Sequence, residues 1–302
     1  MTTGPPPPYS AGALLATLAA LCWGGALVMS KSVLASFPPV FLLVVQLVAS
    51  VALLWGYLLL RRAPLPRLTR RDLLAVAALG LLEPGLAYLL SLIGLLFTEA
   101  GSAALIYASE AVLILALSAL LFGEKPGARL TLLSLLALGG LVVALGALHP
   151  GGISGGRLLG NALVFAGTLT AALYVVLSGR FARRIDAVLI VAWQQLAALG
   201  FALALLPLER LFTPNASLDA PPSAWALAAA SGVVQYALAF SLYIAALARI
   251  GANYAGSFLN LIPVFGLAGA FVFLGERMSW LQLCGAAVTL GAVAIINRRA
   301  RE

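Results

Sequence analysis

Long apolar runs dominate the chain, and this pattern limits it to one broad class of fold. Ten runs of about 20 residues follow one another, separated by short polar or proline- and glycine-rich breaks. A helix of this length spans the hydrocarbon core of a bilayer. The runs cover approximately residues 11–31, 39–60, 72–96, 101–122, 128–148, 158–179, 187–206, 223–247, 253–274 and 279–297. The sequence therefore predicts an all-α integral membrane protein with ten transmembrane helices.

The composition of the 302-residue chain excludes a soluble enzyme. Hydrophobic residues make up 63% of the chain and charged residues 9%, whereas soluble domains are about 45–50% apolar and about 25% charged. Such a chain could not cover a water-exposed surface with polar groups. Ten spans would leave roughly 100 residues for all loops and tails, so we expect no folded domain outside the membrane.

Basic residues fall unequally on the two sides of the predicted membrane domain. If the N-terminus is cytoplasmic, all but four of the 18 Lys and Arg residues lie in cytoplasmic loops or tails. The four on the outer side are Lys31, Arg157, Arg210 and Arg277. Cytoplasmic loops of membrane proteins carry such an excess, so both termini are predicted to be cytoplasmic. Because this charge is scattered over loops, it does not indicate a nucleic-acid partner.

The two halves of the chain resemble each other at a nearly constant spacing. Residues 121–125 (Leu-Phe-Gly-Glu-Lys) match residues 273–277 (Phe-Leu-Gly-Glu-Arg) at an offset of 152. This Gly-Glu-basic turn lies between the fourth and fifth span of each half, where its charges can cap helices, form ion pairs or extend to the interface. At offsets of 148 to 152, three further pairs match, namely Gly80 with Gly232, Tyr88 with Phe240 and Gln46 with Gln194.

This internal match predicts two repeats of five spans each. We expect a disordered tail at residues 1–10, a first repeat at 11–148, a linker at 149–157, a second repeat at 158–297 and a C-terminal tail at 298–302. Because five is odd, the second repeat would enter the membrane from the opposite side. Inverted repeats are typical of alternating-access carriers with a substrate site near the midplane. The alternative is a duplication that merely built a stable bundle.

The two repeats and the Gly-Glu-Lys or Gly-Glu-Arg turn before the last helix of each resemble the drug/metabolite transporter superfamily, EamA type. Within it the chain is most similar to the YddG amino-acid exporters of the bacterial inner membrane. The resemblance covers nearly the whole chain and implies two inverted five-helix repeats around a central cavity. The chain departs from the family at Glu110-Ala111, where such carriers commonly have proline, and it keeps this proline only in the second repeat, at Pro263.

Two glutamates lie inside predicted spans, where an ionisable side chain is costly and usually faces a water-filled cavity. Glu83 is followed by Pro84 and Gly85, so this turn is predicted to kink or to act as a hinge. Glu110 lies three residues after Tyr107, which places both on one helical face. A carboxylate beside an aromatic ring suits a substrate with an ammonium group and an apolar side chain. The alternative is a protonated glutamate that bonds to a neighbouring helix.

Further polar and aromatic side chains in the spans could either pack between helices or line the cavity. Tyr236, Phe240 and Tyr243 are spaced so as to share one face of the eighth span. Besides the two glutamates, the candidate cavity residues are Trp23, Tyr88, Tyr107, Tyr174, Gln235, Tyr236, Phe240 and Asn260. Pro263 joins Pro84 and Gly85 as a candidate hinge residue.

Sequence signatures of catalysis and cofactor binding are absent. The chain contains no Gly-x-x-x-x-Gly-Lys-Ser/Thr loop, no His-Glu-x-x-His motif and no Cys-x-x-Cys pair. Its single histidine, His149, lies in a predicted loop. We therefore expect no enzymatic activity, no cofactor and no metal site.

The sequence thus predicts a secondary transporter that exports amino acids (aromatic, hydrophobic or other neutral ones) or related small metabolites across the bacterial inner membrane by alternating access. Its partners would be a small-molecule substrate and the lipid bilayer, and its assembly a monomer or a homodimer. A multidrug or cationic-compound exporter is the alternative carrier. A membrane-embedded enzyme or a structural membrane subunit is the alternative from another class. Proton coupling through the two glutamates is left open.

Overall fold

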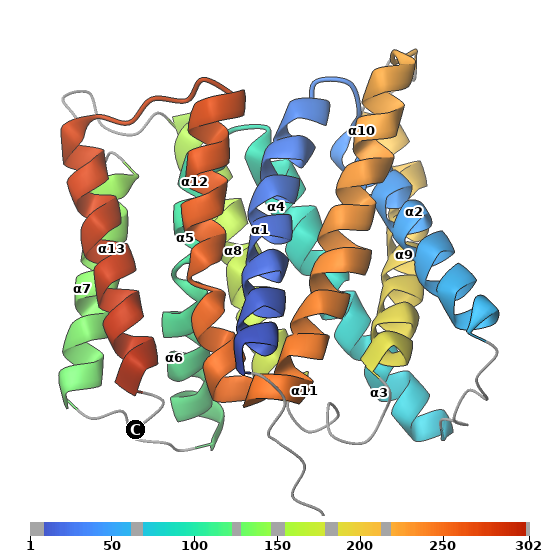
Figure 1. The fold of residues 1–302 in the computed structure, drawn as a ribbon. Coiled ribbons are helices and arrows are strands. Elements are labelled where there is room, and N and C mark those ends of the chain that lie inside the picture. Colours follow the sequence, from blue (N-terminus) through green and yellow to red (C-terminus); the bar gives the residue numbers. More distant parts are fainter. Residues whose placement is uncertain are drawn as a thin grey trace, which may run out of the picture.

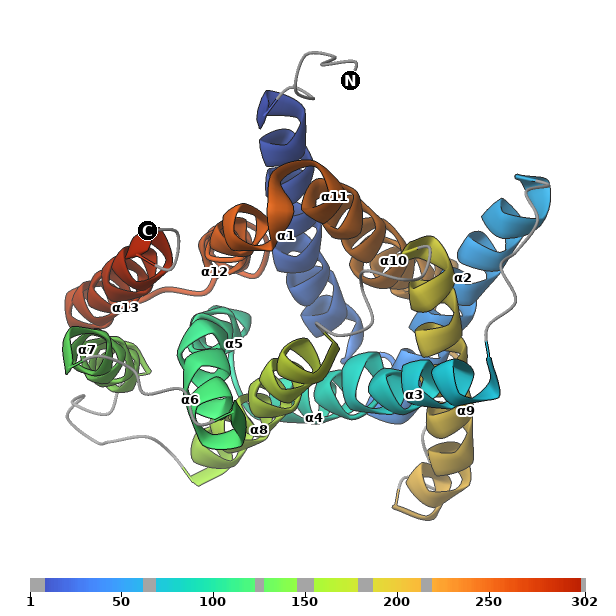
Figure 2. The same cartoon turned by 90° about the horizontal axis from the view of Figure 1, so that it is seen from below.

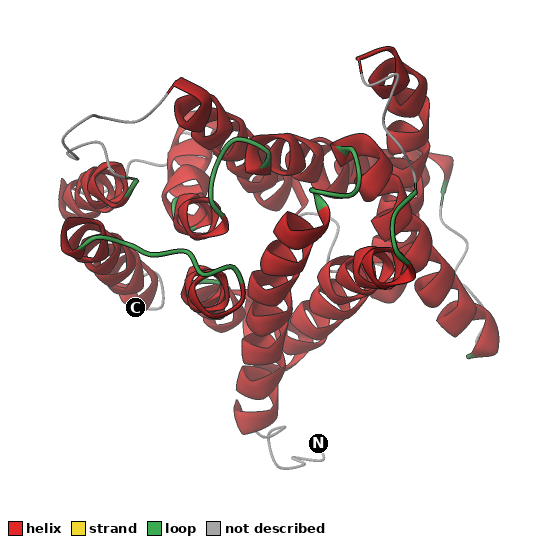
Figure 3. Ribbon diagram, turned by 90° about the horizontal axis from the view of Figure 1, so that it is seen from above, coloured by secondary structure: helices red, strands yellow, loops and turns green. Residues whose placement is uncertain are grey.

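The computed structural model describes residues 9–61, 69–122, 128–145, 155–178, 187–212 and 219–299, which are almost entirely helical and contain no strand (Figure 3). The elements of the first half are α1 (Tyr9–Val33), α2 (Pro39–Leu60), α3 (Arg70–Gly80), η1 (Leu81–Leu86), α4 (Ala87–Leu95), α5 (Ala100–Tyr107), α6 (Glu110–Phe122) and α7 (Ala128–Ala144). Those of the second half are α8 (Gly155–Ser178), α9 (Ala187–Phe212), α10 (Pro222–Gly232), η2 (Val233–Leu238), α11 (Ala239–Phe258), α12 (Leu261–Phe273) and α13 (Trp280–Arg299). The η segments are single π-helical turns.

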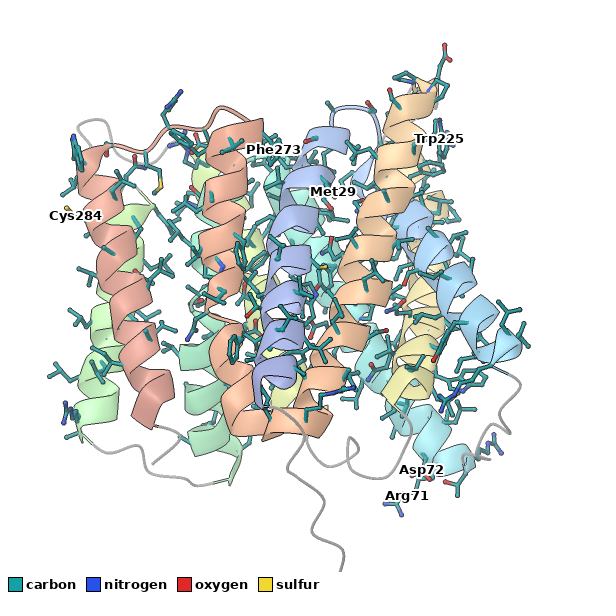
Figure 4. All side chains as sticks on the ribbon, viewed as in Figure 1. Met29, Arg71, Asp72, Trp225, Phe273 and Cys284 are labelled. Carbon is teal, nitrogen blue, oxygen red and sulfur yellow. The ribbon has the colours of Figure 1, made fainter. Side chains whose placement is uncertain are left out.

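The described helices fit a membrane protein by length and by surface. Seven helical stretches are long and apolar enough to cross a bilayer, and three shorter apolar helices accompany them. Large apolar side chains project from the outside of the bundle (Figure 4), and Leu60, Leu120, Phe273 and Trp280 are each at least 79% exposed. Apolar surface of this extent favours contact with lipid over contact with water. The chain is therefore a multi-pass membrane protein.

The two ends of the bundle differ in which helices begin there. In Figure 1, α1 begins and α13 ends at the lower end. Arg71 and Asp72 lie near the start of α3 at this lower end, whereas Trp225 lies near the start of α10 at the upper end (Figure 4). Both α3 and α10 contain 11 residues and pass into a six-residue π-helical segment. Two similarly built elements thus start from opposite ends.

Contacts between helices divide most of the bundle into two groups. The first group contains α1, α2, α10, η2, α11 and α12, because α1 packs against α10, α11 and α12, and α2 packs against α10 and η2. The second group contains α3, η1, α4, α5, α6, α8 and α9, because α8 packs against α4, α5 and α6, and α9 packs against α3 and η1. Each group therefore combines helices from both halves of the chain.

The groups meet mainly along two contacts, α2 against α9 and α5 against α12. The remaining pair, α7 and α13, packs chiefly against itself at one side of the bundle (Figures 1 and 2).

One glycine in each group allows two helix backbones to approach each other closely. Gly80 at the end of α3 lies against the backbone of Gln194 in α9, and Gly232 at the end of α10 lies against that of Gln46 in α2. At either position a Cβ atom would collide with the facing backbone. The residue pairs that match between the two halves of the sequence therefore form two reciprocal contacts, for which small residues are needed.

We expect Gly232→Ala to destabilise the bundle, because the added methyl group must push α10 away from α2. Overpacking of this kind typically costs about 1–3 kcal/mol. The matched control is Gly139→Ala in α7, where a Cβ atom meets nothing within 4 Å and no loss is expected. The free energy of unfolding of each purified variant in mixed detergent micelles, compared with that of the wild type, measures both losses. Equal stability of the two variants would contradict the close contact.

Candidate functional site

The third predicted span is interrupted at Glu83, between α3 and α4. The backbone of Glu83 is extended (φ −144°, ψ 124°) inside the π-helical segment η1. The next residue, Pro84, has no N–H group to donate to the helix, and the Glu83-Pro84 peptide bond is cis. Pro84 and Gly85 are both buried. This geometry turns the Glu83 side chain away from a regular helical position, at the turn where the sequence predicts a bend.

The fourth predicted span is interrupted as well. The helix α5 ends at Tyr107, and α6 begins at Glu110 after a turn at Ala108 and Ser109. The Ser109 hydroxyl donates a hydrogen bond to the carbonyl oxygen of Ile106 (2.6 Å). Glu110 therefore occupies the first turn of α6, where the helix dipole favours a negative charge.

Glu83 and Glu110 come together from these two interruptions. Both side chains are half-buried, and the two carboxyl groups are close enough to interact electrostatically. Among the described residues, neither carboxyl group forms a hydrogen bond or an ion pair with another side chain or backbone group. A partly buried carboxylate without a partner is unfavourable. The two groups are thus available to a ligand.

Aromatic side chains from both helix groups pack in pairs beside these carboxyl groups. Trp23 of α1 lies edge-on to Phe240 (ring centroids 5.2 Å apart) and to Tyr243 (5.5 Å), both in α11. Tyr88 of α4 lies edge-on to Tyr236 of η2, at 5.0 Å. Tyr236 thus has a different ring partner from Phe240 and Tyr243. Tyr236 lies in the π-helical turn η2, whereas Phe240 and Tyr243 lie in α11.

Three tyrosines connect the aromatic side chains to the carboxyl groups. Tyr107 and Tyr174 interact electrostatically with Glu83, and Tyr107 and Tyr243 interact with Glu110. These tyrosines come from α5, α8 and α11. The structure therefore brings together, from both helix groups, most of the residues that the sequence singles out.

Buried amides and hydroxyls hold the neighbouring helices in register. Gln46 of α2 is fully buried and donates to the hydroxyls of Ser30 (2.9 Å) and Ser231 (2.8 Å). Ser30 in turn donates to Gln235 Oε1 (3.3 Å), so Gln235 belongs to this network. The sequence predicts Gln235 as a cavity residue but does not identify its partners. The available signal was the match of Gln46 with Gln194 in apolar spans, where polar side chains bond across helices.

Two buried hydrogen-bond donors of these aromatic pairs have no acceptor among the described residues. The Tyr236 side chain is 0% exposed, and its hydroxyl has no hydrogen-bond partner among the described residues. The Trp23 Nε1 group is also buried without a partner. The backbone of Tyr236 is held by Gln195, which donates to its carbonyl oxygen (3.0 Å). Leaving a buried donor unsatisfied costs about 1–3 kcal/mol, so a ligand that accepts these bonds would recover it.

The remaining candidates lie around this cluster. The Tyr174 hydroxyl donates to Gln194 Oε1 (3.1 Å). Asn260 lies at the break between α11 and α12, and Pro263 is buried in the first turn of α12. No interaction that the structure describes joins Asn260 to the carboxyl groups. In the part of the chain that is described, no three His, Cys, Asp or Glu side chains gather as metal ligands.

We expect the bond between Tyr174 and Gln194 to stabilise the packing of α8 on α9. A double-mutant cycle with Tyr174→Phe, Gln194→Leu and the double variant should give a coupling free energy of about 0.6 kcal/mol, the average for interhelical hydrogen bonds in membranes. The free energy of unfolding in detergent micelles provides the four values. Additive losses would show that the two side chains do not interact.

Comparison with known proteins agrees with this architecture. The EamA-like transporter family model matches residues 10–146 and, separately, residues 158–298. A solved crystal structure with 22% sequence identity superposes with a TM-score of 0.67, covering 97% of this chain and 98% of that chain. The fold is therefore one already observed.

Curated relatives are named as transporters. An uncharacterized transporter of Synechocystis is 28% identical over 294 residues, which cover 92% of this chain and 87% of the relative. The uncharacterized transporter YdeK of Bacillus subtilis is 28% identical over 284 residues, with 93% and 95% covered. A probable terminal-alkyne amino-acid exporter of Streptantibioticus cattleyicolor is 28% identical over 232 residues, with 76% and 74% covered.

Proposed function

Because the chain belongs to the EamA-like transporter family, we propose that it is a secondary transporter that exports amino acids or closely related small metabolites. The observation that carries this proposal is the pair of carboxyl groups of Glu83 and Glu110, which have no bonding partner among the described residues. Such groups stabilise the ammonium group of a substrate, and the surrounding rings offer an apolar surface and cation–π contacts.

The two unpartnered donors complete the recognition of an amino acid. An amino acid carries a carboxylate beside its ammonium group, and this carboxylate needs donors. The Tyr236 hydroxyl and Trp23 Nε1 have no acceptor in the protein, and hydrogen bonds to an ionised acceptor are the stronger ones. The relative in Streptantibioticus cattleyicolor that is named as a probable amino-acid exporter supports this substrate class.

The transport cycle is alternating access by ten spans in two inverted repeats, at residues 11–148 and 158–297. The separate family matches to each half and the opposite starting ends of α3 and α10 (Figure 4) support this arrangement. The moving bodies are the two helix groups, each built from both halves. Pro84, Gly85 and Pro263 absorb the bending. The lower end in Figure 1 faces the cytoplasm of a bacterial cell, with the protein in the inner membrane.

Purified protein in liposomes tests the proposal. We expect counterflow of labelled neutral amino acids such as phenylalanine, because the site offers complementary groups for both substrate charges. The panel includes the decarboxylated amine of each amino acid and a cationic dye, since two carboxyl groups beside aromatic rings also suit an organic cation. Absence of amino-acid transport would overturn the proposal, and transport of dye alone would establish the cation exporter instead.

We expect Tyr236→Phe to separate amino acids from amines. Loss of a hydrogen bond to the substrate carboxylate removes about 1.5–3 kcal/mol, so transport of phenylalanine should fall at least about tenfold. Phenethylamine has no carboxylate, and its transport should not change. The control is Tyr57→Phe, since Tyr57 of α2 is 51% exposed on the outside of the bundle. An equal loss for both substrates would mean that Tyr236 only supports packing.

We expect Glu110→Gln and Glu83→Gln each to lower transport of both substrates by about tenfold or more, because each removes a charge that faces the ammonium group. Unchanged kinetics for every substrate would remove that glutamate from the site. The same assay with an imposed pH gradient tests proton coupling. If the carboxyl groups exchange a proton for the substrate, the gradient accelerates the wild type and not the two variants.

A further inference from the structure

The turn between α4 and α5, residues 96–99, lies beside one of the two main contacts that join the helix groups. Both α4 and α5 belong to the second group, and α5 packs against α12 of the first (Figure 2). Small residues form this contact. A Cβ atom at Gly266 would lie 2.8 Å from that of Ala104, and one at Gly101 would lie 3.9 Å from that of Ala270. Ala104 and Ala270 are 0% exposed.

A carboxylate in the turn that follows α12 of the first group caps the start of α5. Glu276, in the turn before α13, accepts hydrogen bonds from the backbone N–H of Ala100 (2.8 Å) and of Gly101 (2.7 Å). The first N–H groups of a helix have no intrahelical acceptor, and a negative charge there is favourable. Glu99, which precedes α5, does not cap it and pairs instead with Arg157 (2.9 Å). The second group thus relies on the first for this cap.

A lysine of the first group binds the other side of the same turn. Lys31, near the end of α1, donates hydrogen bonds to the carbonyl oxygens of Leu95 and Thr98, the latter at 2.7 Å. Carbonyl groups at a helix C-terminus favour a cation. Lys31 also interacts electrostatically with Glu276 and Glu99. Opposite charges of the first group therefore hold the end of α4 and the start of α5.

The lower parts of the same spans are not joined in this way. Below the interruption at Ala108 and Ser109, α6 packs mainly against α8 of its own group. In the part of the chain that the structure describes, α6 makes no extensive contact with α11 or α12. The two groups therefore meet at the upper halves of these spans and not at the lower halves.

We propose that the contact of α5 with α12, fastened by Glu276 and Lys31, is a closed gate above the site of Glu83 and Glu110, and that it must open in each transport cycle. This inference rests on the proposed transport function. Opening would replace the bonds of Glu276 and Lys31 with bonds to water, which is available at the membrane surface. The helices α1 and α12, which belong to one group, would stay together.

Two engineered disulfides with nearly equal Cβ separations test the gate. In a background with Cys22→Ser and Cys284→Ser, the pair Gly101→Cys and Ala270→Cys links α5 to α12 across the gate. Its Cβ separation of 3.9 Å lies within the usual range of about 3.5–4.5 Å for a disulfide. The control pair, Gly269→Cys with Val28→Cys, links α12 to α1 within the first group, at a Cβ separation of 3.8 Å.

We expect oxidation of the gate pair to reduce transport at least tenfold and a reductant to restore it, whereas the oxidised control pair should transport at the rate of its reduced form. Mass spectrometry of each sample confirms the crosslink. Undiminished transport by the crosslinked gate pair would overturn the gate. A cysteine-free background protein that transports none of the substrates would instead contradict the proposed function, so the two failures are distinguishable.

A second measurement follows the opening without a crosslink. Ala104→Cys, buried in the closed contact, should react several times faster with a membrane-impermeant maleimide when Glu276→Gln is added, because the cap on α5 is weakened. The control is Glu209→Gln. Glu209 of α9 accepts comparable bonds from the N–H groups of Val40 (2.7 Å) and Phe41 (2.9 Å) at the start of α2. It joins the same two helix groups, but at the contact of α2 with α9 rather than at α5, so faster labelling with Glu276→Gln and not with Glu209→Gln is specific to the gate. Equal labelling with and without Glu276→Gln would overturn the role of Glu276 as a latch.

Discussion

Inside a bilayer every backbone N–H and C=O group must find its partner within the protein, so an interrupted helix is tolerated only where protein or a water-filled space surrounds it. The third and fourth spans are interrupted at Glu83 and just before Glu110. This constraint requires both interruptions to face the interior of the bundle. The carboxyl groups of Glu83 and Glu110, which lie at the interruptions, are therefore also placed in the interior. The position of the candidate site thus follows from the solvation of the backbone as much as from the side chains.

The sequence located these carboxyl groups because so little else in its apolar runs is ionisable. Pro84 after Glu83 marked the first interruption through the chemistry of its missing N–H group. The apolar runs also predicted a helical membrane protein, and the family resemblance drawn from the two repeats and their Gly-Glu-basic turns is confirmed by the match to the EamA-like model. These features depend only on residues that are close together in the sequence, so they can be predicted from the sequence alone.

Other features depend on which helices meet, and the sequence could not supply them. Glu276 caps a helix that begins 176 residues earlier in the chain. The sequence shows that an acidic residue lies in a turn, but it does not show which distant helix that residue caps. Tyr236 packs on Tyr88, whereas Phe240 and Tyr243 pack on Trp23. Their spacing along the chain predicts a shared helical face but not these partners, which come from α4 and α1.

Two pairs of glutamates in the bundle differ in their bonding partners. Glu209 and Glu276 each accept two backbone N–H groups at a helix start, so their charges are already used in holding the fold together. Glu83 and Glu110 have no such partner among the described residues and interact electrostatically with each other and with tyrosines. A bond that must break during transport is least costly at the membrane surface, where water replaces it. A charge that must capture an ammonium group acts most strongly in the interior, where water does not compete. A glutamate that holds two helices together is therefore expected at the end of the bundle, and a glutamate that binds the proposed substrate is expected at its centre.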